Sequence, residues 1–140
     1  MIAYFDTSAL IPLVVGEPAS STCSRLWNEA TRVVSTRLIY PEARAALAQA
    51  QRMNRLTVME LEQAVDELDA IALEISYIEV SAELVASAGD LAQTHGLRGY
   101  DAVHLASAVL VNDEELALVT GDHELAAAAQ SIGMSVALTT

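Results

Sequence analysis

The stretch IAYFDTSAL (residues 2–10) contains the pattern that decides the fold. Its first four residues form an apolar run of strand type, which ends directly at Asp6. A short helix is expected next, near Ala9–Val15, with Ser8 as its N-cap. This start leaves Pro12 in the first turn of the helix, where its missing N–H group does no harm. The segment therefore predicts a strand, an acidic residue and a helix, in that order.

A second stretch, ALVTGDHELAAAAQSIG (residues 117–133), has the same order. Its first four residues are expected to form a strand, Asp122 follows, and a helix then ends near Gly133. Further strands are expected at 33–35, 75–80 and 134–138, and further helices at 18–30, 38–53, 57–73, 81–96 and 97–111. Short apolar strands that alternate with helices predict an α/β fold, namely a three-layer α/β/α sandwich with a mostly parallel central sheet of about five strands.

Local signals also place several helix ends. Pro18 is expected in the opening turn of the second helix, Thr57 and Glu60 have the spacing of a capping box, and Gly96 is expected to end a helix. No linker, low-complexity segment or internal repeat interrupts the order of elements. Residues 1–140 are therefore expected to form a single domain.

The composition argues against several classes of protein. The chain is 53% hydrophobic, with a mean hydropathy of +0.35, yet no apolar run approaches the roughly 20 residues that a membrane-spanning helix needs. The N-terminus has no basic region before an apolar stretch, as a secretory signal would have. Cys23 is the single cysteine, so no internal disulfide can form and a reducing environment is expected. We expect a soluble, cytoplasmic protein that does not enter a membrane.

The charge is strongly negative and unevenly distributed. The formal net charge is −12, from 19 acidic and 7 basic residues, and all the basic residues are arginines. Five arginines lie within residues 32–55, whereas residues 56–97 contain nine acidic residues and no arginine. Two interpretations stay open. The arginines can be ordinary surface residues beside a solvated acidic face, or the 32–55 segment, including Arg37 and Arg44, can face an approaching polyanion or partner.

The stretch LRGYDAVHLASAVLV (residues 97–111) is expected to be a helix that is apolar almost all the way round after its first turn. Such a helix packs inside a domain, yet it carries Asp101 near its start. An ionised carboxylate beside a buried surface must be paired, hydrogen-bonded, protonated or bound to a metal. His104 could be the partner of Asp101 at the i, i+3 spacing. A single histidine on an apolar helix is, however, more often a structural core residue than a catalytic one.

Asp101 belongs with three other acids in the predicted fold. Asp6 and Asp122 follow strands, while Glu42 and Asp101 lie in the first turns of helices. Taken singly, the first two can be N-caps, and Glu42 can interact with its helix dipole while facing solvent or the edge of the core. Together, all four are expected on the rim where the C-terminal ends of parallel strands meet.

Carboxylates gathered on one rim repel one another unless a cation neutralises them. An all-oxygen set, with no cysteine and no histidine at metal-binding spacing, suits Mg²⁺ or Mn²⁺. Acidic clusters that hold such ions commonly serve phosphoryl transfer.

Four motifs, in this order, carry a family resemblance: YFDTSAL, YPEARAAL, RGYDAVHLASA and LVTGDHELAAAA. They resemble the four acidic motifs of PIN-domain ribonucleases, most closely those of the VapC-type toxins of toxin–antitoxin pairs. The resemblance covers essentially the whole chain. The metal-binding catalytic site that it implies consists of Asp6, Glu42, Asp101 and Asp122. The small hydroxyl residues that would support this site are Thr120 and either Ser8 or Thr7.

The resemblance also implies an activity and partners. The protein would be an Mg²⁺- or Mn²⁺-dependent endoribonuclease, a hydrolase in which metal-activated water attacks a phosphodiester bond and leaves a 5′-phosphate and a 3′-hydroxyl. Its substrates would be structured RNAs, commonly transfer RNA or a ribosomal RNA loop. It would form a homodimer, and a small cognate antitoxin would block the site.

The net charge keeps a different class of function open. A protein of charge −12 is expected to bind RNA weakly through general electrostatics, because phosphate contacts depend on Lys and Arg. Three features could compensate for this weak attraction of RNA. They are phosphate contacts from the 32–55 arginines and the metal ions, a dimer that joins two basic patches, or a restriction to a few substrates that are selected by shape. The alternative is a PIN-like binding module without catalytic activity. A receiver domain fits less well because the chain has no lysine, and an aspartyl phosphatase because Ser8 occupies the position of the second Asp.

Overall fold

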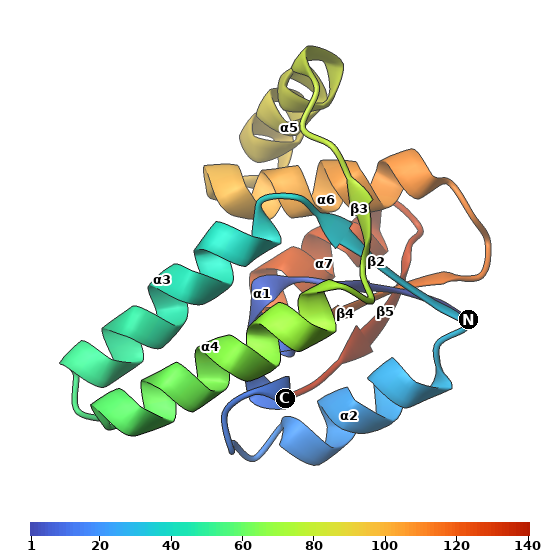
Figure 1. The fold of residues 1–140 in the computed structure, drawn as a ribbon. Coiled ribbons are helices and arrows are strands. Elements are labelled where there is room, and N and C mark those ends of the chain that lie inside the picture. Colours follow the sequence, from blue (N-terminus) through green and yellow to red (C-terminus); the bar gives the residue numbers. More distant parts are fainter.

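The computed structural model describes residues 1–140 and contains a five-stranded sheet surrounded by helices (Figure 1). The strands are β1 (Ile2–Phe5), β2 (Arg32–Thr36), β3 (Ser76–Ile78), β4 (Leu116–Thr120) and β5 (Ser135–Leu138). The α-helices are α1 (Thr7–Leu10), α2 (Ser20–Glu29), α3 (Ile39–Arg52), α4 (Val58–Ala72), α5 (Ala82–His95), α6 (Gly99–Val111) and α7 (His123–Ser131). A 3₁₀ turn, η1 (Ile11–Leu13), continues α1.

The five strands form one parallel sheet in the order β3-β2-β1-β4-β5. In the central strand, β1, Tyr4 pairs with Val34 of β2 on one side and with Leu118 of β4 on the other. The C-terminal end of β1 is therefore the point from which the sheet extends in both directions. Open α/β sheets bind ligands at such a switch point. The predicted sheet is confirmed, and every strand pair in it is parallel.

Helices cover both faces of the sheet because successive side chains of a strand point to opposite faces. Ala3 and Phe5 of β1 belong to a core cluster that contains residues of α1, α2, α3 and α4. Tyr4, which lies between them, belongs to a second cluster with residues of α6 and α7. The predicted three-layer α/β/α sandwich is confirmed.

Helix α5 contributes no buried residue to either of these two core clusters. α5 packs on the outer side of α6, through a small cluster that joins Leu84 and Ala88 of α5 to Ala102 and Ala106 of α6. Figure 1 shows α5 standing away from the sheet, beyond α6. It also shows α3 and α4 side by side, extending together away from the sheet. α6 is thus enclosed between α5 and the sheet, which explains why its middle turns are apolar.

The predicted helix ends are confirmed in two places and wrong in a third. The capping box at Thr57 is present at the start of α4, and Gly96 ends α5 in the left-handed conformation, with φ 64°. Pro18, by contrast, precedes α2, which begins only at Ser20. The N–H group of Ser20 donates to the carbonyl of Glu17, so Pro18 lies in a turn that leads into the helix.

The first helix begins earlier than predicted. α1 starts at Thr7 rather than at Ala9, and Pro12 lies in the 3₁₀ turn that follows. The N-cap is Asp6, whose side chain accepts a hydrogen bond from the N–H of Ala9, and not Ser8. Ser8 is unsuited to this role because it lies inside the helix and its hydroxyl donates back to Asp6.

The end of α6 is less enclosed than its sequence predicts. The residues of its middle turns are buried, but Val109 is 41% exposed and Leu110 is 62% exposed. The apolar pattern therefore extends past the part of the helix that its neighbours cover. No helix of the chain has both the length and the apolar character that are needed to cross a membrane.

Candidate active site

The predicted acids lie on the rim formed by the C-terminal ends of the central strands. Asp6 follows β1 directly, and Asp122 lies two residues after β4, the neighbour of β1. Glu42 lies in the first turn of α3, and Asp101 lies in the first turn of α6. The negative charges of Asp122 and Asp6 both raise the pKa of Asp101, after the larger effect of its burial.

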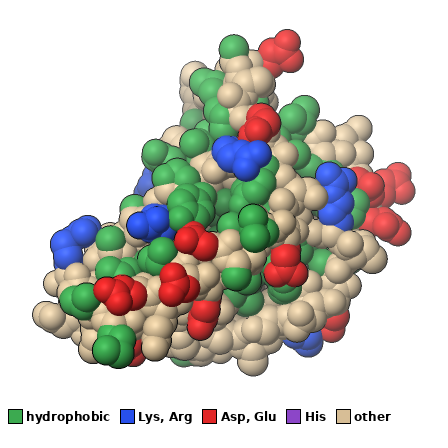
Figure 2. Space-filling model, viewed as in Figure 1, with side chains coloured by type: hydrophobic (Ala, Val, Ile, Leu, Met, Phe, Trp, Pro, Cys, Tyr) green, Lys and Arg blue, Asp and Glu red, His purple; other side chains and the backbone are tan.

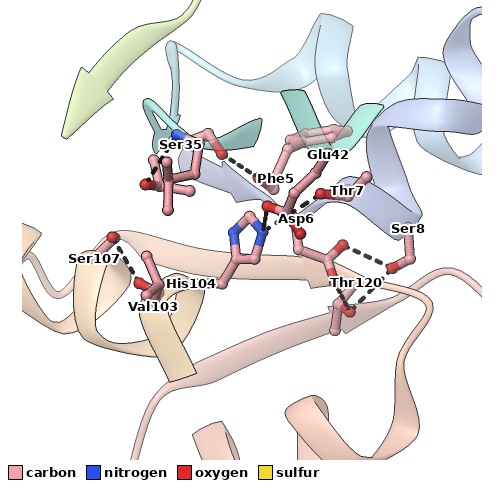
Figure 3. Close-up of polar contacts among 12 residues, drawn as sticks. Phe5, Asp6, Thr7, Ser8, Ser35, Glu42, Val103, His104, Ser107 and Thr120 are labelled. Carbon is pink, nitrogen blue, oxygen red and sulfur yellow. Dashed lines mark hydrogen bonds and ion pairs between the residues drawn. The ribbon is translucent and has the colours of Figure 1, made fainter. Parts of the chain in front are cut away.

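Asp6 is buried, and both of its carboxylate oxygens accept hydrogen bonds (Figure 3). Oδ1 accepts from the hydroxyl of Ser8 at 2.7 Å and from the N–H of Ala9 at 3.1 Å. Oδ2 accepts from the hydroxyl of Thr120 at 2.6 Å. Two of the hydroxyl residues singled out in the sequence thus contact the same carboxylate, one from α1 and one from β4.

The main chain after β4 sets the direction of both hydroxyl groups. The N–H of Gly121 donates to Ser8 Oγ at 2.8 Å, and the N–H of Asp122 donates to Thr120 Oγ1 at 2.9 Å. Because a hydroxyl group has only one proton, an oxygen that accepts from an amide directs that proton elsewhere. In both cases it goes to the Asp6 carboxylate. This network fixes the orientation of Asp6 in the rim.

The surroundings of Asp6 and Asp101 disfavour their ionised forms. Burial raises the pKa of Asp6, while the hydrogen bonds from Thr120 and Ser8 oppose this rise. Partial burial also raises the pKa of Asp101, and the charges of Asp122 and Asp6 raise it further. No hydrogen bond contributes to the pKa of Asp101. A cation between these carboxylates would relieve their repulsion.

Asp122 is also the N-cap of α7. Its Oδ1 accepts from the N–H groups of Glu124 and Leu125, at 2.9 and 3.1 Å. The capping interpretation of Asp122 and of Asp6 is therefore correct, and it does not exclude a second role. In Asp122 the cap occupies Oδ1, so Oδ2 is left for a ligand.

His104 does not form a hydrogen bond with Asp101, contrary to the pairing suggested by their spacing. It points from α6 toward the sheet, where its Nε2 lies 2.8 Å from Glu42 Oε1 (Figure 3). Its Nδ1 lies 2.9 Å from Tyr4 Oη. The hydroxyl of Thr7 is 3.4 Å from the same Nε2. His104 is 1% exposed, as expected for a core residue. The Glu42 side chain is 19% exposed, so this carboxylate faces the core edge rather than open solvent.

The contacts of Tyr4 and His104 were not predicted from the sequence. A signal was nevertheless present, because Tyr4 is the one polar side chain in the strand run IAYF, and a buried tyrosine hydroxyl requires a partner. Nothing local showed that this partner is His104, which is 100 residues away in the chain.

The arginines of residues 32–55 do not form one face. Arg32 begins β2 and Arg37 follows its end, so the two lie at opposite edges of the sheet. The guanidinium of Arg37 forms an ion pair with Glu79 at 2.7 Å and lies 4.1 Å above the ring of Tyr77. Figure 2 shows the basic side chains of this face spread over the surface rather than gathered in one patch. The arginines of residues 32–55 are therefore not gathered at one end of the sheet.

Two other arginines neighbour the acids in the sequence. Arg44 follows Glu42 by two residues on α3 and donates a hydrogen bond to Tyr40 Oη at 2.9 Å. Arg98, which the sequence did not single out, lies directly before α6. Burial raises the pKa of Asp101, and the charge of Arg98 opposes this rise. Arg98 takes part in none of the salt bridges of the structure.

The four acids fit a hard divalent cation by their chemistry. All of them offer oxygen, which Mg²⁺ and Mn²⁺ prefer, and Asp101 adds a carboxylate with like-charged neighbours and no hydrogen-bond donor. In the structure, no three acidic, histidine or cysteine side chains are close enough together to hold a metal ion. Mg²⁺ is commonly bound through one or two carboxylates while it keeps several of its waters, so a site made only of protein ligands is not required.

Comparison with known proteins supports the same assignment. The chain matches the family model of the PIN domain over residues 3–131. It is 42% identical over 136 residues to Ribonuclease VapC45 of Mycobacterium tuberculosis (strain CDC 1551 / Oshkosh), which covers 97% of this chain and 94% of that protein.

Solved structures share the fold. VapC20 of Mycobacterium tuberculosis, described as a sarcin–ricin loop cleaving toxin, has a TM-score of 0.69 at 21% identity and covers 90% of this chain and 94% of that one. A toxin–antitoxin complex from Klebsiella pneumoniae has a TM-score of 0.65 at 21% identity, with coverages of 99% and 98%. With acids of all four motifs on one rim of a parallel sheet, and with the family match and the 42% identity, the chain belongs to the PIN domain family as a ribonuclease of the VapC type.

Proposed function

We propose that this protein is a divalent-metal-dependent endoribonuclease and the toxin of a toxin–antitoxin pair. The observation that carries the proposal is the environment of Asp101. This carboxylate is half-buried, close to Asp6 and Asp122, and without a hydrogen-bond donor, which is the environment that a bound cation would stabilise. The 42% identity to a ribonuclease over nearly the whole chain supports the same reaction class.

The side chains that would hold the ion are those of Asp6, Glu42, Asp101 and Asp122. Mg²⁺ or Mn²⁺ suits this all-oxygen set. Such an ion supplies activation of a water molecule and stabilisation of the charge on the scissile phosphate. The contribution of the chain itself is orientation. Ser8 and Thr120 hold the Asp6 carboxylate, and Thr7 lies beside the histidine that contacts Glu42.

A structured RNA, such as a transfer RNA or a ribosomal RNA loop, is the substrate class that we propose. The net charge of −12 limits general attraction of RNA, which favours substrates that are selected by shape over contacts along any RNA. The description of VapC20 as a sarcin–ricin loop cleaving toxin supports this class. For phosphate contacts we propose Arg44 and Arg98, because Glu79 already offsets the charge of Arg37.

Two protein partners complete the proposal. The similarity to a structure of a toxin–antitoxin complex supports a cognate antitoxin that covers the acidic rim. We also propose that the protein forms a homodimer, which would bring two sets of arginines to one RNA. Size-exclusion chromatography with light scattering, with and without the antitoxin, tests both statements.

Cleavage assays test the activity. The purified protein, freed from antitoxin, should cleave structured RNA with Mg²⁺ or Mn²⁺ and stop when EDTA is added. Asp101→Asn should reduce the cleavage rate by at least roughly 100-fold. Asp90→Asn, which changes an exposed acid of α5, is the matched control and should leave the rate unchanged.

Two results would contradict the proposal. If Asp101→Asn cleaves as fast as the parent protein, the acidic rim is not the catalytic site. If the parent protein binds RNA but does not cleave it with either ion, the fold serves as a binding module instead.

A further inference from the structure

A chain of hydrogen bonds crosses the interior of the protein and ends at Glu42. The N–H of Thr36, at the end of β2, is 3.2 Å from Tyr4 Oη. Tyr4 Oη is 2.9 Å from His104 Nδ1, and His104 Nε2 is 2.8 Å from Glu42 Oε1. The four residues come from β2, β1, α6 and α3. The series of hydrogen bonds therefore joins two neighbouring strands to a helix on each side of the sheet.

The chemistry of the groups limits the arrangement of these hydrogen bonds. A main-chain N–H can only donate, so Tyr4 Oη accepts from Thr36. The phenol proton can go to His104 Nδ1 or to a neighbouring hydroxyl, because the side chains of Ser107 and Ser35 also hydrogen-bond to Tyr4. In either case Tyr4 Oη contacts the Nδ1 side of the ring, and the opposite nitrogen, Nε2, lies at hydrogen-bond distance from Glu42 Oε1.

The packing holds this arrangement in place. Tyr4 is fully buried and His104 is 1% exposed, and their rings meet edge to face with centroids 5.7 Å apart. Burial raises the pKa of Tyr4 far above its ordinary value, so the phenol keeps its proton at all physiological pH values. Water cannot replace the contacts of either ring, because neither is accessible to it.

We propose that His104 is a positioning residue: the Tyr4 hydroxyl and the burial of the ring hold the imidazole in place, so that its Nε2 fixes the Glu42 carboxylate in the acidic rim. The ring holds Oε1 and leaves Oε2 to face an incoming divalent cation. This role deepens the proposed nuclease function and rests on it only for its consequence, because the contact between His104 and Glu42 is itself a property of the metal-free protein.

Glu42 needs such a contact more than Asp6 and Asp122 do. Its side chain has three rotatable bonds, and a free glutamate in the first turn of a helix samples several rotamers. Asp6 and Asp122 are held by main-chain N–H groups, which the fold places without further help. Partners that orient ligands commonly change metal affinity or activity by roughly 10- to 100-fold. We expect His104 to act within this range.

Nuclear magnetic resonance tests the contacts of the ring directly. The chain has three histidines, and ¹⁵N-histidine labelling with His95→Gln and His123→Gln variants assigns their ring signals. In the metal-free protein, the His104 ring signals should shift in Tyr4→Phe and in Glu42→Gln, because both groups hydrogen-bond to the ring. Tyr77→Phe, which removes a hydroxyl that donates to the carbonyl of Ala72, is the matched control and should leave these signals unchanged.

Metal binding tests the consequence. The affinity for Mn²⁺, measured by electron paramagnetic resonance of the free ion, should fall by roughly 10-fold or more in His104→Leu. His104→Gln should recover part of the loss, because its amide N–H₂ can still donate to Glu42. In a Glu42→Gln background, His104→Leu should cause little further change. Circular dichroism and thermal melting confirm that each variant is folded.

The results separate this inference from the proposed function. His104 ring signals that do not respond to Tyr4→Phe or to Glu42→Gln overturn the contacts on which the inference rests, even if the protein binds Mn²⁺ and cleaves RNA. Equal Mn²⁺ affinities of the parent protein and of folded His104→Leu overturn the positioning role. If Asp101→Asn and Glu42→Gln also leave Mn²⁺ affinity and cleavage unchanged, the proposed metal site fails, while the measurement of the ring contacts stands on its own.

Discussion

The hydroxyl of Thr120, at the end of β4, donates a 2.6 Å hydrogen bond to Oδ2 of Asp6, at the end of β1. The same hydroxyl oxygen accepts from the N–H of Asp122 at 2.9 Å. One threonine therefore links two acids of the rim and the two central strands that carry them. Without it, a buried carboxylate oxygen would lose the hydrogen bond that replaces its hydration.

Thr120→Val should lower the free energy of unfolding by about 1–3 kcal/mol, because valine has nearly the same shape but donates nothing to Asp6. Urea denaturation of the metal-free protein measures the change. Thr94→Val, at an exposed position of α5, is the matched control and should change the stability by less than about 0.5 kcal/mol. Equal stabilities of the two variants would show that Asp6 does not depend on this hydroxyl.

Gly121 lies where the chain leaves β4, and a side chain there would be crowded. A Cβ atom would lie 3.0 Å from Thr139 Oγ1, which is a tight contact, and 3.5 Å from Ser8 Oγ, which is an ordinary one. Gly121→Ala should therefore force Thr139 to shift and lower the melting temperature. Gly89→Ala, inside α5 with open space around its Cβ position, should raise the stability by about 0.5–1 kcal/mol. A neutral Gly121→Ala would mean that Thr139 moves aside freely.

The raised pKa values of Asp6 and Asp101 predict how stability depends on pH. In both residues the folded-state pKa lies above the ordinary value of 3.8, with burial as the main cause. Between 3.8 and the raised pKa, the folded protein binds more protons than the unfolded chain. The free energy of unfolding therefore falls as the pH rises through this window. Above the raised pKa it stays at the lower value.

Asp101→Asn should consequently stabilise the metal-free protein at neutral pH, and its advantage over the parent should vanish as the pH falls toward 3.8 and below. Urea denaturation in EDTA across this pH range measures the difference, with Asp90→Asn as the control that changes an exposed acid. Added Mn²⁺ should reverse the order at neutral pH by stabilising the parent protein more than the variant. A stability difference that does not vary with pH would contradict the raised pKa of Asp101.

The positions of the acids were predictable from the sequence because they follow from strand ends. Once β1 and β4 are parallel neighbours, Asp6 and Asp122 must lie at the same edge of the sheet, whatever the details of packing. The same geometry separates the first two arginines of the 32–55 segment. Arg32 and Arg37 are five residues apart, but a strand rises roughly 3.3 Å per residue, so β2 carries them to opposite edges.

The partners of the acids were not predictable in the same way. His104 and Glu42 are 62 residues apart, and their contact depends on how α3 and α6 approach the sheet from its two sides. Local spacing suggested Asp101 as the partner of His104 because both lie on one helix. The ring instead turns toward Tyr4, since the sheet offers a buried hydroxyl there. Side-chain pairing between elements follows from tertiary packing, which periodicity does not encode.

Arg98 provides the last prediction, which concerns RNA binding. It lies directly before α6, its charge acts on Asp101, and no acid holds it in a salt bridge. A phosphate near the rim would therefore meet a free guanidinium. Arg98→Gln should weaken RNA binding several-fold and reduce the slope of log affinity against log salt concentration by roughly one.

Fluorescence anisotropy with a labelled structured RNA, in EDTA so that no cleavage occurs, measures both quantities. Arg32→Gln removes the same charge at the opposite edge of the sheet and is the matched control. If both variants weaken binding equally, RNA responds only to the net charge of the protein. If only Arg98→Gln does so, and with the smaller salt slope, a phosphate lies beside Asp101, at the end of α6 that faces the acids.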